Sequence, residues 1–323
     1  MRDGAPARSP DPPVVGTGVR LPQVGLGGAA FGNLGQPVTD EDAEALLLAA
    51  WAAGIRYFDT APHYGLGLSE ARLGRFLRTR PRDEVVLSTK VGRLLEDGGT
   101  ERPDDQGFAV TSRLVRRRDY TRSGVLRSLE SSLERLGVDR VDVVLIHDPD
   151  EHWRDAVREA YPCLHDLREQ GVVGAIGVGM NQSEMPAAFV RETEIDCVLL
   201  AGRYTLLDRS GADDLLPLCQ ERGVAVIAGG VFNSGLLAAP VPSATFDYAP
   251  APAALVGRAM RMAEVCRRYG LALPDAALAF PLRHPAVSSL LLGVRSIAQL
   301  TQNLASLTAS IPAELWAEID ALP

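Results

Sequence analysis

Four polar residues lie at or just beyond the ends of short apolar runs: Asp59, Tyr64, Lys90 and His147. Each has a simple structural explanation, such as capping a turn, reaching water or packing in the core. Together they can transfer a proton at an alcohol or carbonyl oxygen. A tyrosine hydroxyl has an ordinary pKa near 10, and a neighbouring lysine ammonium lowers that pKa. A carboxylate would keep the lysine charged, and a histidine would orient the substrate oxygen. The combination therefore favours a catalytic site.

These side chains need a scaffold that brings the ends of separate strands together. Short apolar runs alternate with amphipathic stretches along the chain. The predicted strands are Gln23–Gly27, Arg56–Thr60, Glu84–Lys90, Val141–His147, Val173–Val178, Asp196–Leu200, Val224–Ala228 and Ser289–Gly293. The predicted helices are Asp40–Ala53, Ser69–Arg78, Thr121–Leu136, Asp155–Gln170, Ser183–Val190, Gly211–Arg222, Ala254–Tyr269, Ser296–Leu304 and Ala313–Leu322.

Eightfold alternation of this kind predicts parallel strands joined by right-handed crossovers, and hence an α/β fold of the (β/α)₈ TIM-barrel class. In that fold the carboxyl ends of all strands meet at one mouth, where the four polar residues would lie. A doubly wound sheet is the alternative. It is less favoured because the glycines at 25–28 are followed by Gly32, a spacing that breaks the dinucleotide-binding pattern GxGxxG.

Several segments fall outside this alternation. Val14–Val24 is predicted to form a small hairpin around Gly16, and residues 1–13, rich in Pro, Arg and Asp, are predicted to be a disordered lead. Residues 14–323 are predicted to form a single domain. Two long loops, Gly92–Tyr120 and Gly230–Pro252, follow barrel strands, so they should shape a ligand site at the carboxyl-end face.

The composition narrows the range of partners. A net charge of −8 argues against nucleic acid, and the run Arg116–Arg118 is expected to be a solvated loop. The four cysteines form no CxxC pair, so buried, reduced thiols are expected. No apolar run is long enough for a membrane span or a signal peptide, which favours the cytoplasm and no membrane partner. His147 has no second ligand at a recognisable spacing, so no metal is expected. We expect a monomer or small homo-oligomer acting on a small molecule.

The motifs around the four residues resemble those of the aldo-keto reductases. The resemblance covers FDTAPHYG at 58–65 with Ser69-Glu70, STKVG at 88–92, VDVVLIH at 141–147, and GVRS at 293–296 with Asn303 beyond. It implies that Tyr64 is the general acid/base, that Lys90 and Asp59 tune it, and that His147 binds the substrate oxygen. It also implies NAD or NADP bound in an extended form across the barrel mouth.

AGRYTLLD at 201–208, GGVFNSGLL at 229–237 and HDPD at 147–150 resemble one branch of the family more closely. That branch holds L-fucose and D-threo-aldose 1-dehydrogenases, L-galactose dehydrogenase and pyridoxal 4-dehydrogenase. It implies oxidation of an aldose or cyclic hemiacetal at C1 to the lactone by hydride transfer. The implied substrate is a sugar or an aldehyde.

The resemblance also suggests residues that bind the ligands. The cofactor candidates are Gly28, Asn181, Gly230, Phe232, Ser234, Gly235, Leu236, Gly293, Arg295, Ser296, Gln299 and Asn303. The substrate candidates are Ala29, Phe31, His63 and Tyr204. Ala201, Gly229 and the pair Gly179-Met180 depart from the family pattern for holding nicotinamide, and Phe232 or Tyr204 is suggested as replacement aromatic surface. Arg295 suits a 2′-phosphate, yet a second basic residue is missing nearby, which favours NAD slightly.

Other functions remain open from the sequence alone. The same four residues would serve an NADPH-dependent aldehyde or ketone reductase. A redox-sensing, non-catalytic binding barrel is a further alternative, but such a protein would not need all four catalytic residue types. A phosphate-binding isomerase barrel would use the glycines at 229 and 230, but it would leave the four polar residues without a role.

Overall fold

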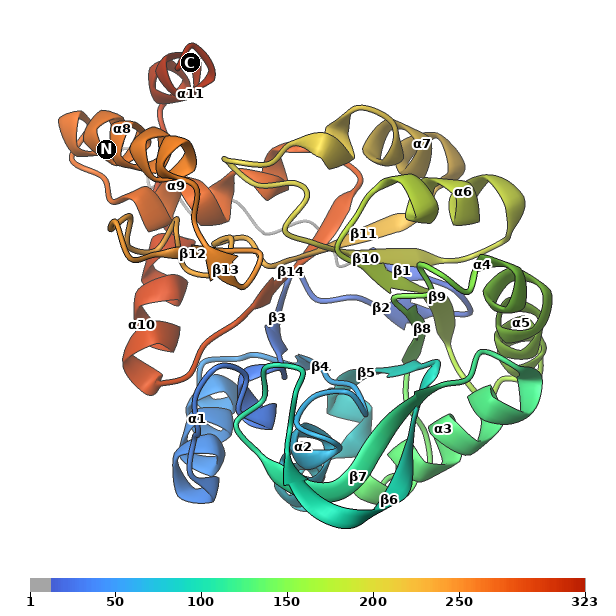
Figure 1. Ribbon diagram of the computed structural model, residues 1–323. Coiled ribbons are helices and arrows are strands. Elements are labelled where there is room, and N and C mark those ends of the chain that lie inside the picture. The colour runs from blue at the N-terminus through green and yellow to red at the C-terminus, as the bar shows by residue number, and fades with distance from the viewer. Residues whose placement is uncertain (1–12, 323) are drawn as a thin grey trace.

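Eight parallel strands close into one barrel in the computed structural model, which describes residues 13–322 (Figure 1). The strands are β3 (Val24–Gly27), β4 (Tyr57–Asp59), β5 (Val86–Val91), β8 (Val143–His147), β9 (Ala175–Met180), β10 (Cys197–Ala201), β11 (Ala225–Gly229) and β14 (Val287–Leu292). Each pairs with the next along the chain, and β14 pairs with β3 to close the ring. The predicted barrel is confirmed, and a doubly wound sheet is excluded.

Helices surround the barrel (Figure 1). They are α1 (Asp40–Ala52), α2 (Leu68–Leu77), α3 (Arg122–Leu136), α4 (Trp153–Asp155), α5 (Tyr161–Glu169), α6 (Glu184–Glu192), α7 (Leu215–Arg222), α8 (Ala253–Arg268), α9 (Leu273–Ala279), α10 (Ile297–Ser306) and α11 (Ala313–Asp320). Thr39 and Thr121 accept hydrogen bonds from backbone N–H groups and so cap α1 and α3. The predicted helix Asp155–Gln170 is divided by a π-helical turn at Ala156–Ala160, and α9 was not predicted.

The predicted amino-terminal hairpin is present as β1 (Val14–Val15) and β2 (Val19–Arg20). It covers the end of the barrel opposite the catalytic mouth, because Val15 and Val19 join the apolar cluster of the barrel interior with Tyr57 and Val143. A Cβ on Gly16 would lie 2.1 Å from the backbone oxygen of Gly174, so glycine is required at this contact. The lead predicted for residues 1–13 lies, except for Pro13, outside the described residues.

The segment Gly92–Tyr120, predicted to be a loop, is instead a long antiparallel hairpin of β6 (Arg93–Pro103) and β7 (Thr111–Arg118) at the barrel mouth (Figure 1). The expectation of a solvated arginine run is wrong for Arg116. Its side chain is 5% exposed, pairs with Asp104 and donates to the backbone oxygen of His63 over 2.8 Å. A carboxylate and a carbonyl together compensate the buried charge.

The loop between β11 and α8 carries a second small hairpin, β12 (Thr245–Phe246) and β13 (Ala249–Pro250). Short 3₁₀ turns lie at Ala30–Gly32, Arg82–Glu84, Ser210–Ala212 and Pro281–Arg283. The four cysteines are unpaired and buried, as expected. Among residues 13–322, no helix combines the length and apolar character needed to cross a bilayer.

Candidate active site

Asp59, Lys90 and Tyr64 form a hydrogen-bonded chain at the carboxyl ends of β4 and β5. Lys90 Nζ donates to Asp59 Oδ2 over 2.7 Å, to the backbone oxygen of Thr60 over 2.9 Å, and to the Tyr64 hydroxyl over 3.0 Å. These three bonds use every proton of the ammonium group. The side chains of Lys90 and Asp59 are 1% and 3% exposed, so the pair is held away from water. Lys90 therefore has one fixed position, with its charge directed at the phenol.

Ser88 and Tyr57 hold the carboxylate of Asp59 in place. Ser88 Oγ donates to Asp59 Oδ1 over 2.7 Å, and the Tyr57 hydroxyl lies 3.1 Å from Ser88 Oγ. All three residues are buried. Each carboxylate oxygen of Asp59 thus has its own donor, Ser88 for Oδ1 and Lys90 for Oδ2. The sequence analysis did not select Ser88, although it precedes Lys90 by two residues and so projects on the same side of β5.

Burial dominates the acidity of Tyr64. Loss of hydration raises the pKa of the Tyr64 hydroxyl to about 12, although the Lys90 ammonium lowers it. The pKa of Lys90 is raised, because burial, which lowers it, is outweighed by the attraction of Asp59 and Tyr64. The predicted lowering effect of Lys90 on the pKa of Tyr64 is present, but burial outweighs it. Tyr64 is therefore a neutral phenol, able to donate a proton, near pH 7.

His147 ends β8 with its ring 5.9 Å from that of Tyr64, centroid to centroid. Burial, and then the positive charge of Arg93, lower the pKa of His147 well below its usual value, so the imidazole is neutral. Its Nδ1 is buried and has no hydrogen-bond partner among the described residues. The Tyr120 hydroxyl donates to the His147 backbone oxygen over 2.6 Å and fixes the end of the strand. The structure thus brings together all four predicted catalytic residues.

Three further residues surround this group, and two of them, Arg93 and Asp148, were not among the predicted site residues. Arg93, the first residue of β6, pairs with Asp148 over 2.5 Å, and its NH1 lies 3.3 Å from both ring nitrogens of His63. His63 was a predicted substrate residue, and its ring lies 5.5 Å from that of His147. Burial and Arg93 lower the pKa of His63 to about 2, so it too is neutral. The position of Arg93, three residues beyond Lys90, was the available sequence signal.

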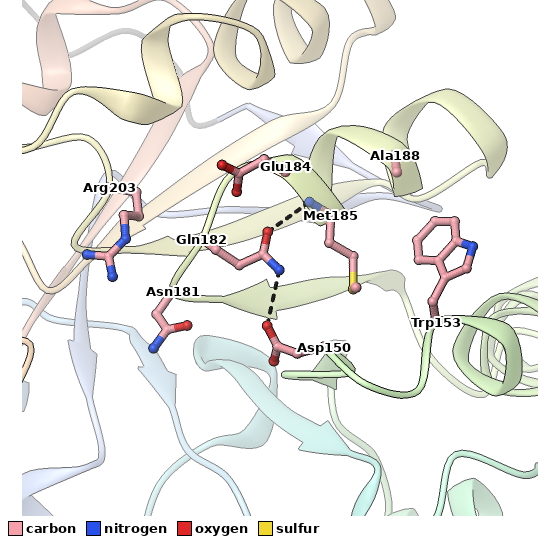
Figure 2. A pocket seen from close by; sticks show the side chains of 8 residues that line it. All are labelled: Asp150, Trp153, Asn181, Gln182, Glu184, Met185, Ala188 and Arg203. Atoms are coloured by element: carbon pink, nitrogen blue, oxygen red, sulfur yellow. Dashed lines mark hydrogen bonds between the residues drawn. The ribbon is translucent and has the colours of Figure 1, made fainter.

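An open groove of about 670 Å³ is lined by residues of the loops that follow β8, β9 and β10 and of the start of α6 (Figure 2). Asp150, in the loop that follows β8 and His147, lines this groove. The cofactor candidate Asn181 and Arg203 also line it. Gln182 donates to Asp150 over 3.1 Å and accepts from the backbone N–H of Met185, which ties the loop after β9 to the start of α6 (Figure 2). The catalytic four are not among the lining residues, so this groove does not itself contain the catalytic group.

The glycine candidates divide into two kinds. A Cβ on Gly28 would lie 2.6 Å from the backbone oxygen of Asp59 and 2.7 Å from Ser69 Oγ, so Gly28 is required by packing. A Cβ on Gly293 or Gly235 would meet nothing within 4 Å. Gly230 and Gly293 are exposed. The open ends of β11 and β14 therefore leave room for an extended ligand to lie against the backbone.

The loop after β11 presents further candidates. Ser234 is exposed, and its Oγ accepts from the backbone N–H of Tyr248 over 3.1 Å, which leaves the hydroxyl proton free for a phosphate oxygen. Leu236 is fully buried in an outer apolar cluster, so only its backbone is available. Phe232 is half-buried and packs against the two main apolar clusters.

The candidates near α10 build the amino terminus of that helix. Ser296 caps it by accepting from the Gln299 backbone N–H over 3.2 Å, while Gln299 Oε1 accepts from the Arg295 backbone N–H over 2.8 Å. Arg295 NH2 donates to the backbone oxygen of Leu34 over 2.7 Å, and its buried Nε has no partner among residues 13–322. Asn303 is buried further along the helix. An exposed, capped helix start beside a guanidinium fits a phosphate group.

Two substrate candidates do not join the catalytic group. Phe31 is 2% exposed and packs in the core cluster between barrel and helices. The ring of Tyr204 packs 5.0 Å from that of Phe280 and 5.9 Å from that of His284, in the outer cluster around α8 and α9. Phe31 therefore offers almost no surface to a substrate, whereas the aromatic surface suggested for the partly buried Tyr204 stays a prediction. Ala29 is half-buried beside Gly28 at the end of β3. Among residues 13–322, no cluster of three His, Cys, Asp or Glu could hold a metal ion.

Known proteins share this organisation. Residues 23–323 match the aldo/keto reductase family. D-threo-aldose 1-dehydrogenase of Pseudomonas sp is 46% identical, with 96% of this chain and 97% of that protein covered. Pyridoxal 4-dehydrogenase of Microbacterium luteolum is 42% identical, with 93% of each covered.

Solved structures agree on the fold. The holo form of an aldo-keto reductase from Bacillus halodurans superposes with a TM-score of 0.77 at 23% identity, covering 96% of this chain and 95% of that one. The predicted oxidoreductase class is confirmed by the family match and by the two dehydrogenase relatives. The chain therefore belongs to the aldo/keto reductase family, whose members are oxidoreductases that work with a nicotinamide dinucleotide, NAD or NADP, on small molecules.

Proposed function

We propose that this protein oxidises the C1 hydroxyl of an aldose or cyclic hemiacetal, of the L-fucose or D-threo-aldose type, to the corresponding lactone. The observation that carries the proposal is the hydrogen-bonded chain Asp59–Lys90–Tyr64 beside a neutral His147. The D-threo-aldose 1-dehydrogenase relative, at 46% identity over nearly the full length, supports the substrate class.

The four residues have separate tasks in this reaction. Tyr64 Oη, as the phenolate, accepts the proton of the C1 hydroxyl, and Lys90 Nζ stabilises the phenolate through the 3.0 Å hydrogen bond. Asp59 keeps Lys90 charged and in position. The neutral His147 is able to hydrogen-bond the reacting oxygen without adding a charge. When bound, the nicotinamide dinucleotide supplies the hydride acceptor.

We further propose that the cofactor lies along the open strand ends, with its phosphates near Ser234 and the start of α10. NAD is favoured over NADP. Arg295 is the only basic residue between Gly293 and Asn303, and its guanidinium already donates to Leu34. The side chain of Gln299 is committed to the Arg295 backbone. A 2′-phosphate would thus meet a single cation, which one hydrogen bond already holds to Leu34, without the second basic residue that would favour NADP. Comparing kcat/KM for the two cofactors at a fixed sugar concentration tests this preference.

An aldehyde reductase is the second candidate, and one observation favours it. Because burial raises the pKa of Tyr64 to about 12, Tyr64 at neutral pH is a phenol, the form that donates a proton. Reduction of a carbonyl needs that form, whereas oxidation needs the phenolate. The same site therefore supports both directions, and the substrate decides between them.

A substrate panel separates the candidates. Initial rates are measured for L-fucose, D-arabinose and pyridoxal with NAD⁺ and NADP⁺, and for propanal and benzaldehyde with NADH and NADPH. The proposal predicts that a sugar with NAD⁺ gives the highest kcat/KM. Efficient turnover of the aldehydes with NADPH, without oxidation of any sugar, would replace the proposed function with the second candidate. Pyridoxal is included because a relative at 42% identity is a pyridoxal 4-dehydrogenase.

A further inference from the structure

A charged pair from two different loops borders the catalytic group. Arg93 follows β5 and Asp148 follows β8, the two strands that carry Lys90 and His147. The side chains of Arg93 and Asp148 are 11% and 21% exposed, so the pair is mostly shielded from water yet open at the mouth. An arginine and an aspartate placed together beside a catalytic histidine offer both donors and acceptors to a ligand.

The pair is not saturated by its own contacts. Arg93 NH2 donates to Asp148 Oδ2 over 2.5 Å, whereas Arg93 Nε is buried and has no partner among residues 13–322. The side-chain contacts of Asp148, to Arg93 and to His147 Nε2 at 3.5 Å, both use Oδ2. The contacts of Arg93 NH1 with His63 and of NH2 with Asp148 do not use all five N–H groups of the guanidinium, and Oδ1 of the carboxylate has no side-chain contact, so both side chains keep hydrogen-bonding capacity for a bound molecule. A buried polar group without a partner is costly, so its presence at a site mouth points to a ligand.

The backbone of Asp148 is held in an uncommon conformation. Its φ is +42°, in the left-handed region that a non-glycine residue rarely adopts. The Asp148 N–H donates to the backbone oxygen of Gly179 over 3.1 Å, and its carbonyl accepts from the Tyr120 hydroxyl over 2.8 Å. These two bonds hold the residue in place despite the strain. A buried ion pair adds little stability on average, and the two backbone bonds give the Asp148 carboxylate the fixed position that a ligand-binding group needs.

The walls beside the pair suit a sugar ring. The rings of His63 and Phe108 are 5.0 Å apart, and that of Phe108 lies 6.1 Å from the Tyr64 ring. The partly exposed rings of His63 and Tyr64 form a wall beside the charged pair, with the buried Phe108 ring packed against both. A sugar has an apolar face of C–H bonds and an edge of vicinal hydroxyls. Each hydroxyl both donates and accepts. The edge therefore matches a carboxylate oxygen next to a guanidinium N–H.

We propose that Arg93 and Asp148 form a hydroxyl-binding pair that selects substrates carrying a vicinal diol beside the carbon oxidised at Tyr64. The inference rests on the proposed function, since it names how that site distinguishes sugars from simple aldehydes. Arg93 and Asp148 are specificity-determining residues here. Proton transfer remains with Tyr64, supported by Lys90 and Asp59, and His147 binds the reacting oxygen.

The test compares two substrates on the same variants. Arg93→Met and Asp148→Asn are assayed for L-fucose oxidation with NAD⁺ and for reduction of propanal, which has no hydroxyl, with NADH. Arg113→Met is the matched control, because Arg113 lies on the same hairpin in an exposed pair with Asp97. We expect kcat/KM for L-fucose to fall about 10- to 100-fold in the two site variants, the scale of hydrogen bonds to charged groups. This loss should be mainly in KM and should be clearly larger than any loss in propanal reduction, which the contact of the pair with His147 could also affect.

Inhibition by a non-reacting polyol gives an independent readout. Xylitol should inhibit propanal reduction competitively in the wild type and in Arg113→Met, and lose that inhibition in Arg93→Met. Arg93→Lys keeps the charge but loses the planar fork, so it should recover only part of the sugar activity. Equal losses on both substrates would show that the pair is only structural and would overturn the inference. A wild type that reduces propanal without oxidising sugars would overturn the proposed function. In that case the hydroxyl-binding role of Arg93 and Asp148 would also be overturned if xylitol did not inhibit the wild type, or inhibited Arg93→Met equally well.

Discussion

Lys90 Nζ lies 3.0 Å from the hydroxyl oxygen of Tyr64 and 4.5 Å from the centre of the Tyr64 ring. The ammonium group is therefore in contact with both the oxygen and the π-face of the residue that transfers the proton. This contact stabilises the ionised phenol more than the neutral one. It reduces the cost of ionising Tyr64 in a buried site, without removing that cost.

Replacing Tyr64 with phenylalanine removes the acid and base and leaves the surrounding walls in place. We expect Tyr64→Phe to lower kcat by roughly two or more orders of magnitude, the usual scale of general acid–base catalysis. Cofactor affinity should be unchanged, since the candidate cofactor residues lie on other loops. Steady-state kinetics and quenching of protein fluorescence by NADH measure the two effects. Near-normal turnover in this variant would remove Tyr64 from its assigned role.

Lys90 and Asp59 also form a buried ion pair whose loss affects stability. Lys90→Met leaves the Asp59 carboxylate without its cation, which should lower the free energy of unfolding by about 3–5 kcal/mol. Asp59→Asn should be similarly costly, because Lys90 then keeps a buried charge. The double variant should lose less than the sum of the single variants. Urea denaturation of all four proteins measures this coupling, and strictly additive losses would contradict it.

The direction of catalysis should respond to pH through Tyr64. Burial raises the pKa of Tyr64 to about 12, so the phenolate fraction grows about tenfold for each pH unit below that value. We expect kcat/KM for sugar oxidation with NAD⁺ to rise with pH between pH 7 and 9, with a slope near one on logarithmic axes. Aldehyde reduction, which uses the phenol, should change little over the same range. A flat oxidation profile would mean that another group accepts the proton.

Periodicity in the sequence was sufficient to place the barrel. The eight predicted strands agree with the observed ones to within two residues at each end, because buried parallel strands are continuous apolar runs. The catalytic four were predictable for a related reason, since strand ends in a barrel meet at one mouth. The motif at residues 58–65 then fixed the choice of Tyr64 among the tyrosines.

Other features depend on contacts that no periodic pattern reveals. The hairpin β6–β7 carries arginines in both strands, so its polar sequence predicted a loop. The burial of Arg116 depends on its ion pair with Asp104 of the same hairpin. Arg93 and Asp148 are distant in sequence and meet only in the fold. The net rise in the pKa of Tyr64 was not predictable, because the sequence shows the cation but not the loss of water around the phenol.

Stability at low pH should depend on His63. The pKa of His63 is lowered to about 2, so between pH 6.5 and 2 the unfolded chain binds a proton that the folded protein does not. The free energy of unfolding therefore falls as the pH drops below 6.5, by at most about 1.4 kcal/mol per pH unit from this group. In His63→Gln that part of the slope should vanish. Denaturation at pH 6.5, 5.5 and 4.5 measures this slope of the free energy of unfolding. Tyr64→Phe, which keeps His63 and His147, is the comparison. Equal slopes in the two variants would contradict the assignment to His63.

Gly28 and Gly293 were both predicted to bind the cofactor, and alanine at each position separates packing from binding. In Gly28→Ala the new Cβ would lie 2.6 Å from the backbone oxygen of Asp59. We therefore expect a loss of roughly 1–3 kcal/mol in the free energy of unfolding, the scale of overpacking. In Gly293→Ala the Cβ meets nothing within 4 Å, so stability should change by less than about 0.5 kcal/mol.

A dinucleotide lying against the end of β14 would instead collide with that Cβ, so KM for NAD⁺ should rise in Gly293→Ala. Thermal unfolding and cofactor titration of the two variants measure both effects. An unchanged KM in Gly293→Ala would show that the cofactor does not approach this strand end. A stable Gly28→Ala with weakened cofactor binding would reverse the two assignments, because it would make Gly28 the position of close approach.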